Sequence, residues 1–274
     1  MNRRHFIATT TTLLAAPALQ IHAEEPQAML DVNFSLGEWP TRDVPAVDVA
    51  GLRRRGISHA ITGSLEAVLH RDLAAVNERL ATACAASGGV LLPAGCLNPL
   101  LPAWQEDLRR CVEEHGMKVL RLLPACHGYT LESPVFRECL DAVTKCGLAL
   151  QIVAQMEDVR TQNPLLRMPP VDLKPLPALL KATPQARVMV LNANSAIITT
   201  ALRGCNSLWL DCAMIEGVGG LENTLQIWPV DKLCLGTHAP FFYPEAALLK
   251  MQESGLSGEK AAQIAERNAR AFLG

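Results

Sequence analysis

The chain has 274 residues, of which 49% are apolar and 19% charged, and its formal net charge is −2. This composition can bury a large core, and the length suits one large domain. The nearly balanced charge, without a long basic block, argues against nucleic acid or an anionic membrane as a partner. A small-molecule substrate or ligand is therefore expected, and a homo-oligomer is an open alternative to a monomer.

The first residues have the features of an export signal. The pair Arg3-Arg4 precedes a modestly apolar run that is diluted by threonines. Paired arginines ahead of a short, weakly apolar segment are typical of twin-arginine signal peptides, and the run is too short and too polar to span a bilayer comfortably. We expect residues 1–23 to be such a signal peptide, with export to a bacterial periplasm and no other membrane association. An ordinary Sec signal is the alternative.

Nine cysteines raise the question of disulfides, because export leads to an oxidising compartment. They form no CxxC pair and show no cysteine–histidine spacing of the kind that binds zinc. Most lie within apolar runs, as Cys212 and Cys234 do. Buried cysteine behaves as a small hydrophobic residue. The sequence therefore predicts thiols in the core and no disulfide framework.

Short apolar runs alternate with amphipathic patterns along the rest of the chain. Strand-like runs occupy residues 29–35, 57–63, 89–97, 117–124, 148–155, 186–194, 207–214 and 232–238. Helix-like stretches, with apolar residues three and four apart, occupy residues 69–86, 103–114, 134–146, 173–182 and 221–228. This alternation predicts a single-domain (β/α)8 TIM barrel over residues 24–274. A doubly wound sheet is disfavoured because no glycine-rich phosphate turn follows the first run.

The alternation of side chains along each strand selects the residues expected inside the barrel, where functional groups gather at the carboxyl ends of the strands. The polar residues expected there, or on the loops that follow, are Asp31, Asn33, Ser35, Arg121, His127, Tyr129, Gln155, Asn192, Asn194, Asp211 and His238. In the first run, Leu30, Val32 and Phe34 are expected to face the outer helices. In the sixth, Val188 and Val190 are expected to face inward with Asn192.

Several segments follow the order of elements in one large enzyme family. "LDVNFSLGEWP" is similar to a D-x-H-x-H first strand with Asp31 as its leading aspartate, and an arginine-bearing strand is followed by "HGY". "WLDCA" is similar to a seventh-strand D-x-S element, "LCLGTHAPF" to an eighth-strand G-[ST]-D-x-P turn, and "AAQIAERNARAFLG" to a closing helix. Over nearly the whole chain after the export signal, the sequence resembles the amidohydrolase-related family, metal-dependent hydrolases of the TIM-barrel superfamily. The resemblance implies a hydrolase, with lactonase-like or decarboxylase-like branches.

The resemblance also implies where the family's metal ligands would be, and the residues present depart from the pattern. The positions are Asn33, Ser35, Val153, Asn192 and His238. Divalent ions in such sites require carboxylate, neutral imidazole or thiolate ligands. Only His238 among these residues is a strong zinc ligand, so we expect no family-type metal centre and no cofactor. A metal held by Cys126, His127 and His238 is a weaker alternative.

The polar residues suggest chemistry on a small polar, carboxylated molecule. Arg121 can grip a carboxylate through two bonds. His238, supported by Asp211, can activate a water molecule, with His127 as the proton donor. The remaining substrate-binding residues would be Asp31, Asn33, Tyr129, Gln155, Asn192 and Asn194.

Structural roles are open alternatives for several of these residues. Asp31 and Arg121 can serve as structural partners inside the barrel, and Asn192 and Asn194 can serve as turn residues or helix N-caps. The loss of most strong metal ligands also fits a non-catalytic binding or accessory protein built on a former hydrolase barrel.

Overall fold

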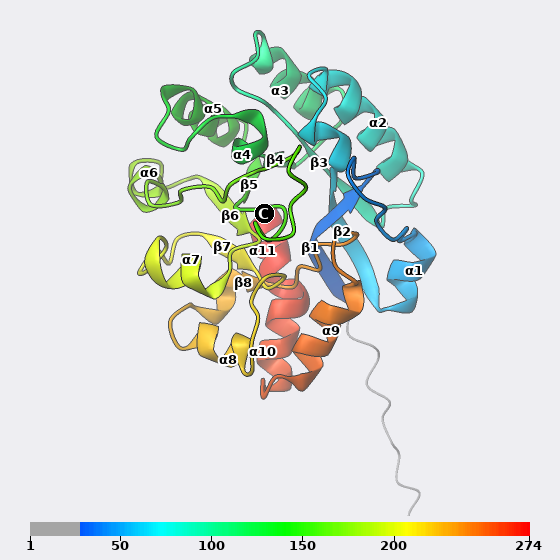
Figure 1. Cartoon of the computed structure of the whole chain (residues 1–274), viewed down its shortest axis with the longest axis vertical. Coiled ribbons are helices and arrows are strands. Elements are labelled where there is room, and N and C mark those ends of the chain that lie inside the picture. Colours follow the sequence, from blue (N-terminus) through cyan, green and yellow to red (C-terminus); the bar gives the residue numbers. More distant parts are fainter. Residues whose placement is uncertain (1–27) are drawn as a thin grey trace, which may run out of the picture.

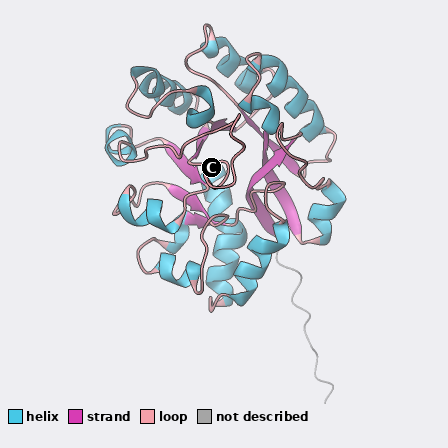
Figure 2. Ribbon diagram, viewed as in Figure 1, coloured by secondary structure: helices cyan, strands magenta, loops and turns pink. Residues whose placement is uncertain are grey.

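The structure of the protein, a computed structural model, describes residues 28–274, and the predicted signal peptide lies outside these residues. Parallel strands form one eight-stranded sheet in the order β1 to β8, with helices around it (Figures 1 and 2). The strands are β1 (Met29–Leu36), β2 (Ile57–Ser64), β3 (Leu91–Gly95), β4 (Val119–Leu122), β5 (Ala149–Val153), β6 (Arg187–Leu191), β7 (Trp209–Asp211) and β8 (Leu233–Cys234). The predicted (β/α)8 barrel is confirmed.

Helices follow the strands in the predicted alternation. They are α1 (Val49–Arg54), α2 (Leu73–Ala85), α3 (Trp104–Glu113), α4 (Pro124–His127), α5 (Pro134–Lys145), α6 (Leu176–Ala182), α7 (Ser195–Thr200), α8 (Gly220–Leu225), α9 (Pro244–Glu253), α10 (Gly258–Ala262) and α11 (Asn268–Leu273), with the short η1 (Leu65–Val68), η2 (Val230–Lys232) and η3 (Gln263–Arg267). Within residues 28–274, no helix has the length and apolarity needed to cross a bilayer.

The expected helix boundary after the second strand was too early, for a reason that capping explains. The predicted helix begins at residue 69, whereas α2 begins at Leu73. The side chain of Asp72 accepts a hydrogen bond of 3.0 Å from the backbone nitrogen of Ala75 and so caps the first turn. The short α7 was missed because its six residues show too little periodicity. Asn194 caps its first turn, which is the N-cap role that was an open alternative for this residue.

Backbone hydrogen bonds between the first and last strands close the barrel. The Val32 nitrogen donates to the Leu235 oxygen, and the Ser35 nitrogen donates to the Ala239 oxygen, each over 2.9 Å. Closure removes the free sheet edges that an open sheet would leave. It also brings the carboxyl end of β1 beside that of β8, although these segments are at opposite ends of the sequence.

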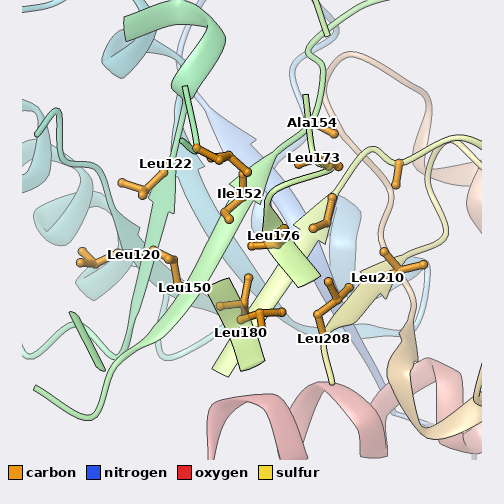
Figure 3. Packing of buried hydrophobic residues seen from close by; sticks show 14 of the residues in the cluster. Leu120, Leu122, Leu150, Ile152, Ala154, Leu173, Leu176, Leu180, Leu208 and Leu210 are labelled. Carbon is orange, nitrogen blue, oxygen red and sulfur yellow. The ribbon is translucent and has the colours of Figure 1, made fainter. Parts of the chain in front are cut away.

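A continuous apolar layer lies between the strands and the helices. Leu120, Leu150 and Leu210 on β4, β5 and β7 pack with Leu176 and Leu180 of α6 (Figure 3). Because alternate residues of β4, β5 and β6 contribute to this layer, the intervening residues of these strands face the barrel interior. The outer layer therefore fixes which residues can reach the site.

The interior faces differ from the expectation in the first strand. Leu30 and Val32 belong to the buried cluster that contains Val119, Ala149 and Met189, whereas only Phe34 packs in the cluster with the helix residues Leu52 and Leu80. A register shift between Asp31 and Phe34 interrupts the alternation. Such an irregularity lets neighbouring residues lie on the same side of the strand. The prediction that Leu30 and Val32 face the helices was wrong.

The sixth strand was displaced by one residue in the prediction. Val188 and Val190 pack in the outer layer, and Met189 and Leu191 belong to the interior cluster. Asn192 nevertheless reaches the interior network, because it follows the strand with φ of 61°, a left-handed conformation that breaks the alternation.

All nine cysteines are free thiols, and all except Cys126 and Cys146 are buried. Burial raises the pKa of the Cys84 thiol to about 12 and that of Cys212 to about 11, so these thiols stay protonated. The seven buried cysteines thus behave as small core residues.

Gly236 provides a test of how tightly β7 and β8 approach each other. A Cβ atom at this position would lie 2.6 Å from Oδ2 of Asp211. We expect Gly236→Ala to lower the free energy of unfolding by about 1–3 kcal/mol through overpacking, measured by chemical denaturation. Gly258→Ala is the matched control, because a Cβ there meets nothing within 4 Å. Equal stability of the two variants would contradict the close approach.

Candidate functional site

Four buried polar residues converge at the carboxyl ends of strands that are distant in sequence. Asn33 lies on β1, Asp211 ends β7, and Asn192 and His238 follow β6 and β8. The φ angles of Asn192 and His238 are 61° and 55°, in the left-handed region that few residues other than glycine adopt. Backbone strain of this kind persists where surrounding contacts enforce it and clusters at functional sites.

The Asp211 carboxylate organises the two asparagines. Asn33 Nδ2 donates to Asp211 Oδ2 and to Asn192 Oδ1, each over 2.7 Å. The backbone nitrogen of Asn192 donates to Asp211 Oδ1 over 2.7 Å. Both carboxylate oxygens are therefore bound by N–H groups. The bond to Asp211 fixes the side-chain amide of Asn33, and the bond that Asn192 Oδ1 accepts from Asn33 fixes that of Asn192.

His238 is held in one orientation by the segment after β5. Its Nε2 lies 2.8 Å from the Met156 carbonyl oxygen, and its Nδ1 lies 3.3 Å from Nδ2 of Asn192. A carbonyl can only accept, so Nε2 carries the hydrogen and Nδ1 keeps its lone pair. The ring also stacks on Phe241, with centroids 5.0 Å apart and planes 4° from parallel. Within the described residues, His238 and Asp211 form no direct hydrogen bond, and Asn192 links them.

Burial shifts the two titrating groups of this network toward their neutral forms. It raises the pKa of Asp211 to about 6, although the hydrogen bonds from Asn33 and Asn192 act in the opposite direction. It lowers the pKa of His238 to about 4. The imidazole of His238 is thus neutral at physiological pH, and the carboxyl group of Asp211 titrates close to physiological pH.

The structure uses the donors of Arg121 within the barrel itself. Nε donates to Oε1 of Gln151 over 2.9 Å, Nη1 donates to the Phe34 oxygen over 2.8 Å, and Nη2 donates to the Ile61 oxygen over 3.0 Å. Burial lowers the pKa of this guanidinium to about 10. Gly63 leaves the space for it, since a Cβ there would lie 2.6 Å from Nη1. Arg121 cross-links several strands, and its role as a carboxylate grip stays a prediction.

Asp31 connects the first and last strands. Its Oδ2 accepts from the Thr237 hydroxyl over 2.5 Å, and its Oδ1 accepts from the backbone nitrogens of Thr237 and Asn33 over 3.0 and 2.9 Å. Burial raises the pKa of Asp31, and these hydrogen bonds oppose the rise. These contacts correspond to the structural role inside the barrel that was an open alternative for Asp31.

The two predicted loop residues lie apart from the network. His127 Nε2 bonds to the Ala67 oxygen over 2.9 Å. Tyr129 packs in the outer apolar layer against Phe136, and its hydroxyl has no partner among the described residues. Neither residue shares a hydrogen bond with His238 in the part of the chain described. Their predicted roles as proton donor and substrate-binding residue stay predictions.

Two cavities meet at this end of the barrel. The inner one, of about 20 Å³, is lined by Asn33, Arg121, Asn192 and His238 among others, and it is large enough for one water molecule. The outer one, the mouth pocket, of about 510 Å³, is lined by Gln155, Asn194, Phe241 and Phe242 and by charged residues that include Arg42 and Glu157. Met156 lines both cavities. The mouth pocket has the size of a small-molecule site.

Sequence reasoning missed several residues of this region. Gln151 shares the inward face with Val153, so strand alternation could have included it. Thr237 directly precedes His238, and its hydroxyl could have been considered as a partner for Asp31. Arg42 and Glu157 lie in irregular segments, where no periodicity indicates which residues approach each other.

The side chains at the expected metal-ligand positions do not fit a divalent ion. Asn33 and Asn192 are committed to each other and to Asp211, and Val153 offers no ligand atom. Within residues 28–274, no group of three or more histidine, cysteine, aspartate or glutamate side chains is gathered as a metal site would require. The alternative ligand set of Cys126, His127 and His238 is likewise not gathered into such a group within these residues. One amide hydrogen of Asn33 points at the Asp211 carboxylate, where a cation would otherwise balance its charge.

Comparison with known proteins gives matches in structure alone. No protein-family model and no curated protein matches the chain. A 5-carboxyvanillate decarboxylase of Novosphingobium aromaticivorans, complexed with manganese, is 13% identical and matches with a TM-score of 0.74 over 90% of this chain and 97% of that one. A 2,6-dihydroxybenzoate decarboxylase from Rhizobium is 14% identical, with a TM-score of 0.68 over 90% and 98%.

A 4-oxalomesaconate hydratase of Rhodopseudomonas palustris is 13% identical, with a TM-score of 0.63 over 89% of this chain and 95% of that one. A protein described as an amidohydrolase II matches in the same way, at 14% identity and a TM-score of 0.68. The chain shares their fold. The resemblance inferred from the sequence motifs is confirmed at this level.

The shifted pKa values of Asp211 and His238 give opposite contributions to stability. Between pH 3.8 and about 6, folded Asp211 holds a proton that the unfolded chain has released, so stability falls as pH rises, by roughly 3 kcal/mol in total. Between about pH 4 and pH 6.5, unfolded His238 binds a proton that the folded chain does not, so stability rises with pH.

We expect Asp211→Asn to remove the falling component, so that the free energy of unfolding rises more steeply between about pH 4 and pH 6 than in the wild type. His238→Asn should remove the rising component and change the slope in the opposite direction. Denaturant titrations across this range measure both, and the slopes are compared because each variant also loses hydrogen bonds. Parallel curves for all three proteins would show that neither pKa is shifted on folding.

Proposed function

We propose that the protein is an enzyme that hydrolyses a small polar, carboxylated organic molecule without a divalent metal. The observation that carries this proposal is the position of His238, a neutral imidazole that lines a cavity large enough for one water molecule beneath a mouth pocket of about 510 Å³. A base beside a water site and below a ligand-sized pocket is the arrangement that water activation requires.

In this proposal the residues of the network have distinct roles. His238 Nδ1 would accept a proton from the water, since Nε2 already carries one. Asp211 positions Asn33 and Asn192, and the Asn192 amide lies 3.3 Å from Nδ1 of His238 and so would orient the ring beside the water cavity. The imidazolium formed in this way would return the proton to the leaving group of the substrate, because the amide groups that lie between His238 and Asp211 cannot carry a proton onward. Arg121 adds positive charge beside the cavity.

The substrate class rests on the structural neighbours as well as on the site. Two of the proteins with this fold are decarboxylases named for 2,6-dihydroxybenzoate and 5-carboxyvanillate, and a third is a hydratase named for 4-oxalomesaconate. All these named compounds carry carboxylate groups. A substrate screen should therefore contain carboxylated esters and lactones for hydrolysis and hydroxybenzoates for decarboxylation.

Replacing His238 tests the mechanism. We expect His238→Asn to lower turnover by about 100-fold or more, because the variant has no base at the water cavity. Asparagine is among the residues that tolerate a φ of 55°, so the fold should persist. Product formation is measured by chromatography on the substrate that the screen identifies, and folding by circular dichroism.

His59→Asn is the matched control for this measurement, because it makes the same exchange at a histidine of β2 that is not among the residues lining either cavity. The His59 Nδ1 atom lies 3.0 Å from the Ser58 hydroxyl, away from the network, so its removal should leave turnover unchanged. Normal turnover of His238→Asn would overturn the proposed mechanism. An equal loss of turnover in both variants would show that the effect is not specific to the water cavity.

Metal content tests the absence of a cofactor. We expect the mature protein, purified without a histidine tag and dialysed against buffer, to contain far less than one equivalent of zinc, manganese or iron, because amides and an alkyl group stand at the expected ligand positions. Elemental mass spectrometry gives the ratio. Turnover should also be insensitive to a chelator, and a stoichiometric metal that survives dialysis would contradict the proposal.

A non-catalytic binding protein is the second candidate, and one observation favours it. The polar groups of the network satisfy one another, and the inner cavity of about 20 Å³ admits no organic molecule as it stands. A ligand confined to the mouth pocket would raise the melting temperature by mass action and remain unchanged. Product analysis separates the two candidates, which a thermal shift alone does not.

Export and self-association are further proposals that the sequence motivates. Paired arginines at Arg3 and Arg4 support twin-arginine export to a periplasm, with residues 24–274 as the mature domain. Substitution of both arginines by lysine should block export, as measured by cell fractionation. Sedimentation of the mature protein determines whether a homo-oligomer forms.

A further inference from the structure

Residues 155–157, which follow β5 after Ala154, form a segment that we call the strap. The Gln155 carbonyl accepts from Asn192 Nδ2, and the Met156 carbonyl accepts from His238 Nε2, each over 2.8 Å. Met156 lines both the inner cavity and the mouth pocket. The strap therefore separates the two cavities and is bound to the candidate catalytic network by its backbone.

The third residue of the strap, Glu157, is bound to the opposite side of the mouth. Its Oε1 accepts from Arg42 Nε over 3.1 Å and from Arg42 Nη2 over 3.0 Å. The side chain of Glu157 is only 7% exposed, whereas that of Arg42 is 46% exposed. A buried carboxylate held by one partly exposed guanidinium is retained by that ion pair, because burial without a partner costs free energy.

The ion pair with Glu157 uses only some of the hydrogen-bond donors of Arg42. Both hydrogen bonds converge on Oε1 of Glu157, and Nη1 of Arg42 forms no hydrogen bond within residues 28–274. A guanidinium binds a carboxylate best through two parallel bonds to its two oxygens. A carboxylate that approaches from the mouth pocket can adopt this geometry and so competes with Glu157.

Arg42 is also connected to His238 through an aromatic side chain. Its guanidinium carbon lies 5.2 Å from the centroid of the Phe241 ring, and Phe241 stacks on the His238 ring. The three side chains form one column from the mouth pocket to the inner cavity. A ligand carboxylate on Arg42 would therefore place the rest of the ligand against an aromatic surface, close to the catalytic histidine.

From these contacts we infer that Arg42 binds the carboxylate of the ligand and that Glu157 occupies Arg42 when no ligand is bound. Ligand binding exchanges one carboxylate for another, which frees the strap from the opposite side of the mouth and gives access to the inner cavity. The inference rests on the proposed function only in taking the ligand to be carboxylated. It predicts that Glu157 weakens ligand binding, whereas a purely structural ion pair would not.

Benzoate and its neutral counterpart benzamide are suitable probes, titrated into the full chain by isothermal calorimetry. We expect benzoate to bind and benzamide not to bind. Glu157→Gln should tighten benzoate binding by roughly fivefold, because the amide competes less well for Arg42. Arg42→Gln should weaken it by about tenfold or more, and Arg42→Lys should restore only part of the loss, since lysine keeps the charge without the paired donors.

Glu216→Gln is the matched control, because Glu216 lines the same pocket and has no hydrogen bond to Arg42. Removal of its charge should leave benzoate affinity close to the wild-type value. The inference is overturned if Glu157→Gln and Glu216→Gln tighten binding equally, if Arg42→Gln binds benzoate as the wild type does, or if no variant binds benzoate. His238-dependent turnover of a carboxylated substrate in the face of such results would leave the proposed function intact.

Discussion

The hydrogen bonds that the Asp211 carboxylate receives are the interaction on which the whole site depends. One buried carboxylate at the end of β7 binds Asn33 of β1 and the backbone after β6. Through these two bonds it joins three strands whose carboxyl ends would otherwise present unpaired polar groups to a buried space. Removal of either partner would leave a desolvated donor or acceptor, which costs about 1–3 kcal/mol in each case. The network is therefore a part of the fold as well as of the candidate site.

This arrangement accounts for how the barrel tolerates several polar residues in its interior. Arg121 and Asp31 are satisfied mainly by backbone groups and by Gln151 and Thr237, so the charges are dispersed over several strands and are not paired directly. Burial then acts on the groups that remain titratable, and it disfavours the charged form of each. The same desolvation that makes the interior costly to assemble gives Asp211 and His238 their shifted pKa values.

The sequence predicts the architecture better than the contacts. Eight apolar runs and the intervening amphipathic patterns are sufficient for the barrel, because burial on both faces of a parallel strand imposes a strong pattern. The interior faces were wrong where the backbone departs from regular geometry, at the register shift after Asp31 and at the left-handed Asn192. Neither departure has a glycine or proline to mark it.

The site shows the same division. Convergence of Asn33, Asn192 and His238 followed from their positions at strand ends, whereas the contact of Arg42 with Glu157 depends on how two irregular loops fold over the mouth. The hydrogen-bond partners of Arg121 could not be predicted either, because most of them are backbone carbonyl groups, which every residue has. To predict that Arg42 lies at the site, one would have to know which loops approach each other in three dimensions.

The left-handed backbone after β6 and β8 determines which side chains a redesign of this barrel can place there. Asparagine, aspartate and histidine are the non-glycine residues that most readily adopt such a conformation, and histidine and aspartate are also residues that bind metal ions. An amide-lined interior and a metal-lined interior can therefore be built on one unchanged main chain at Asn192 and His238. A redesign at these two positions can replace the side chains and keep the backbone conformation.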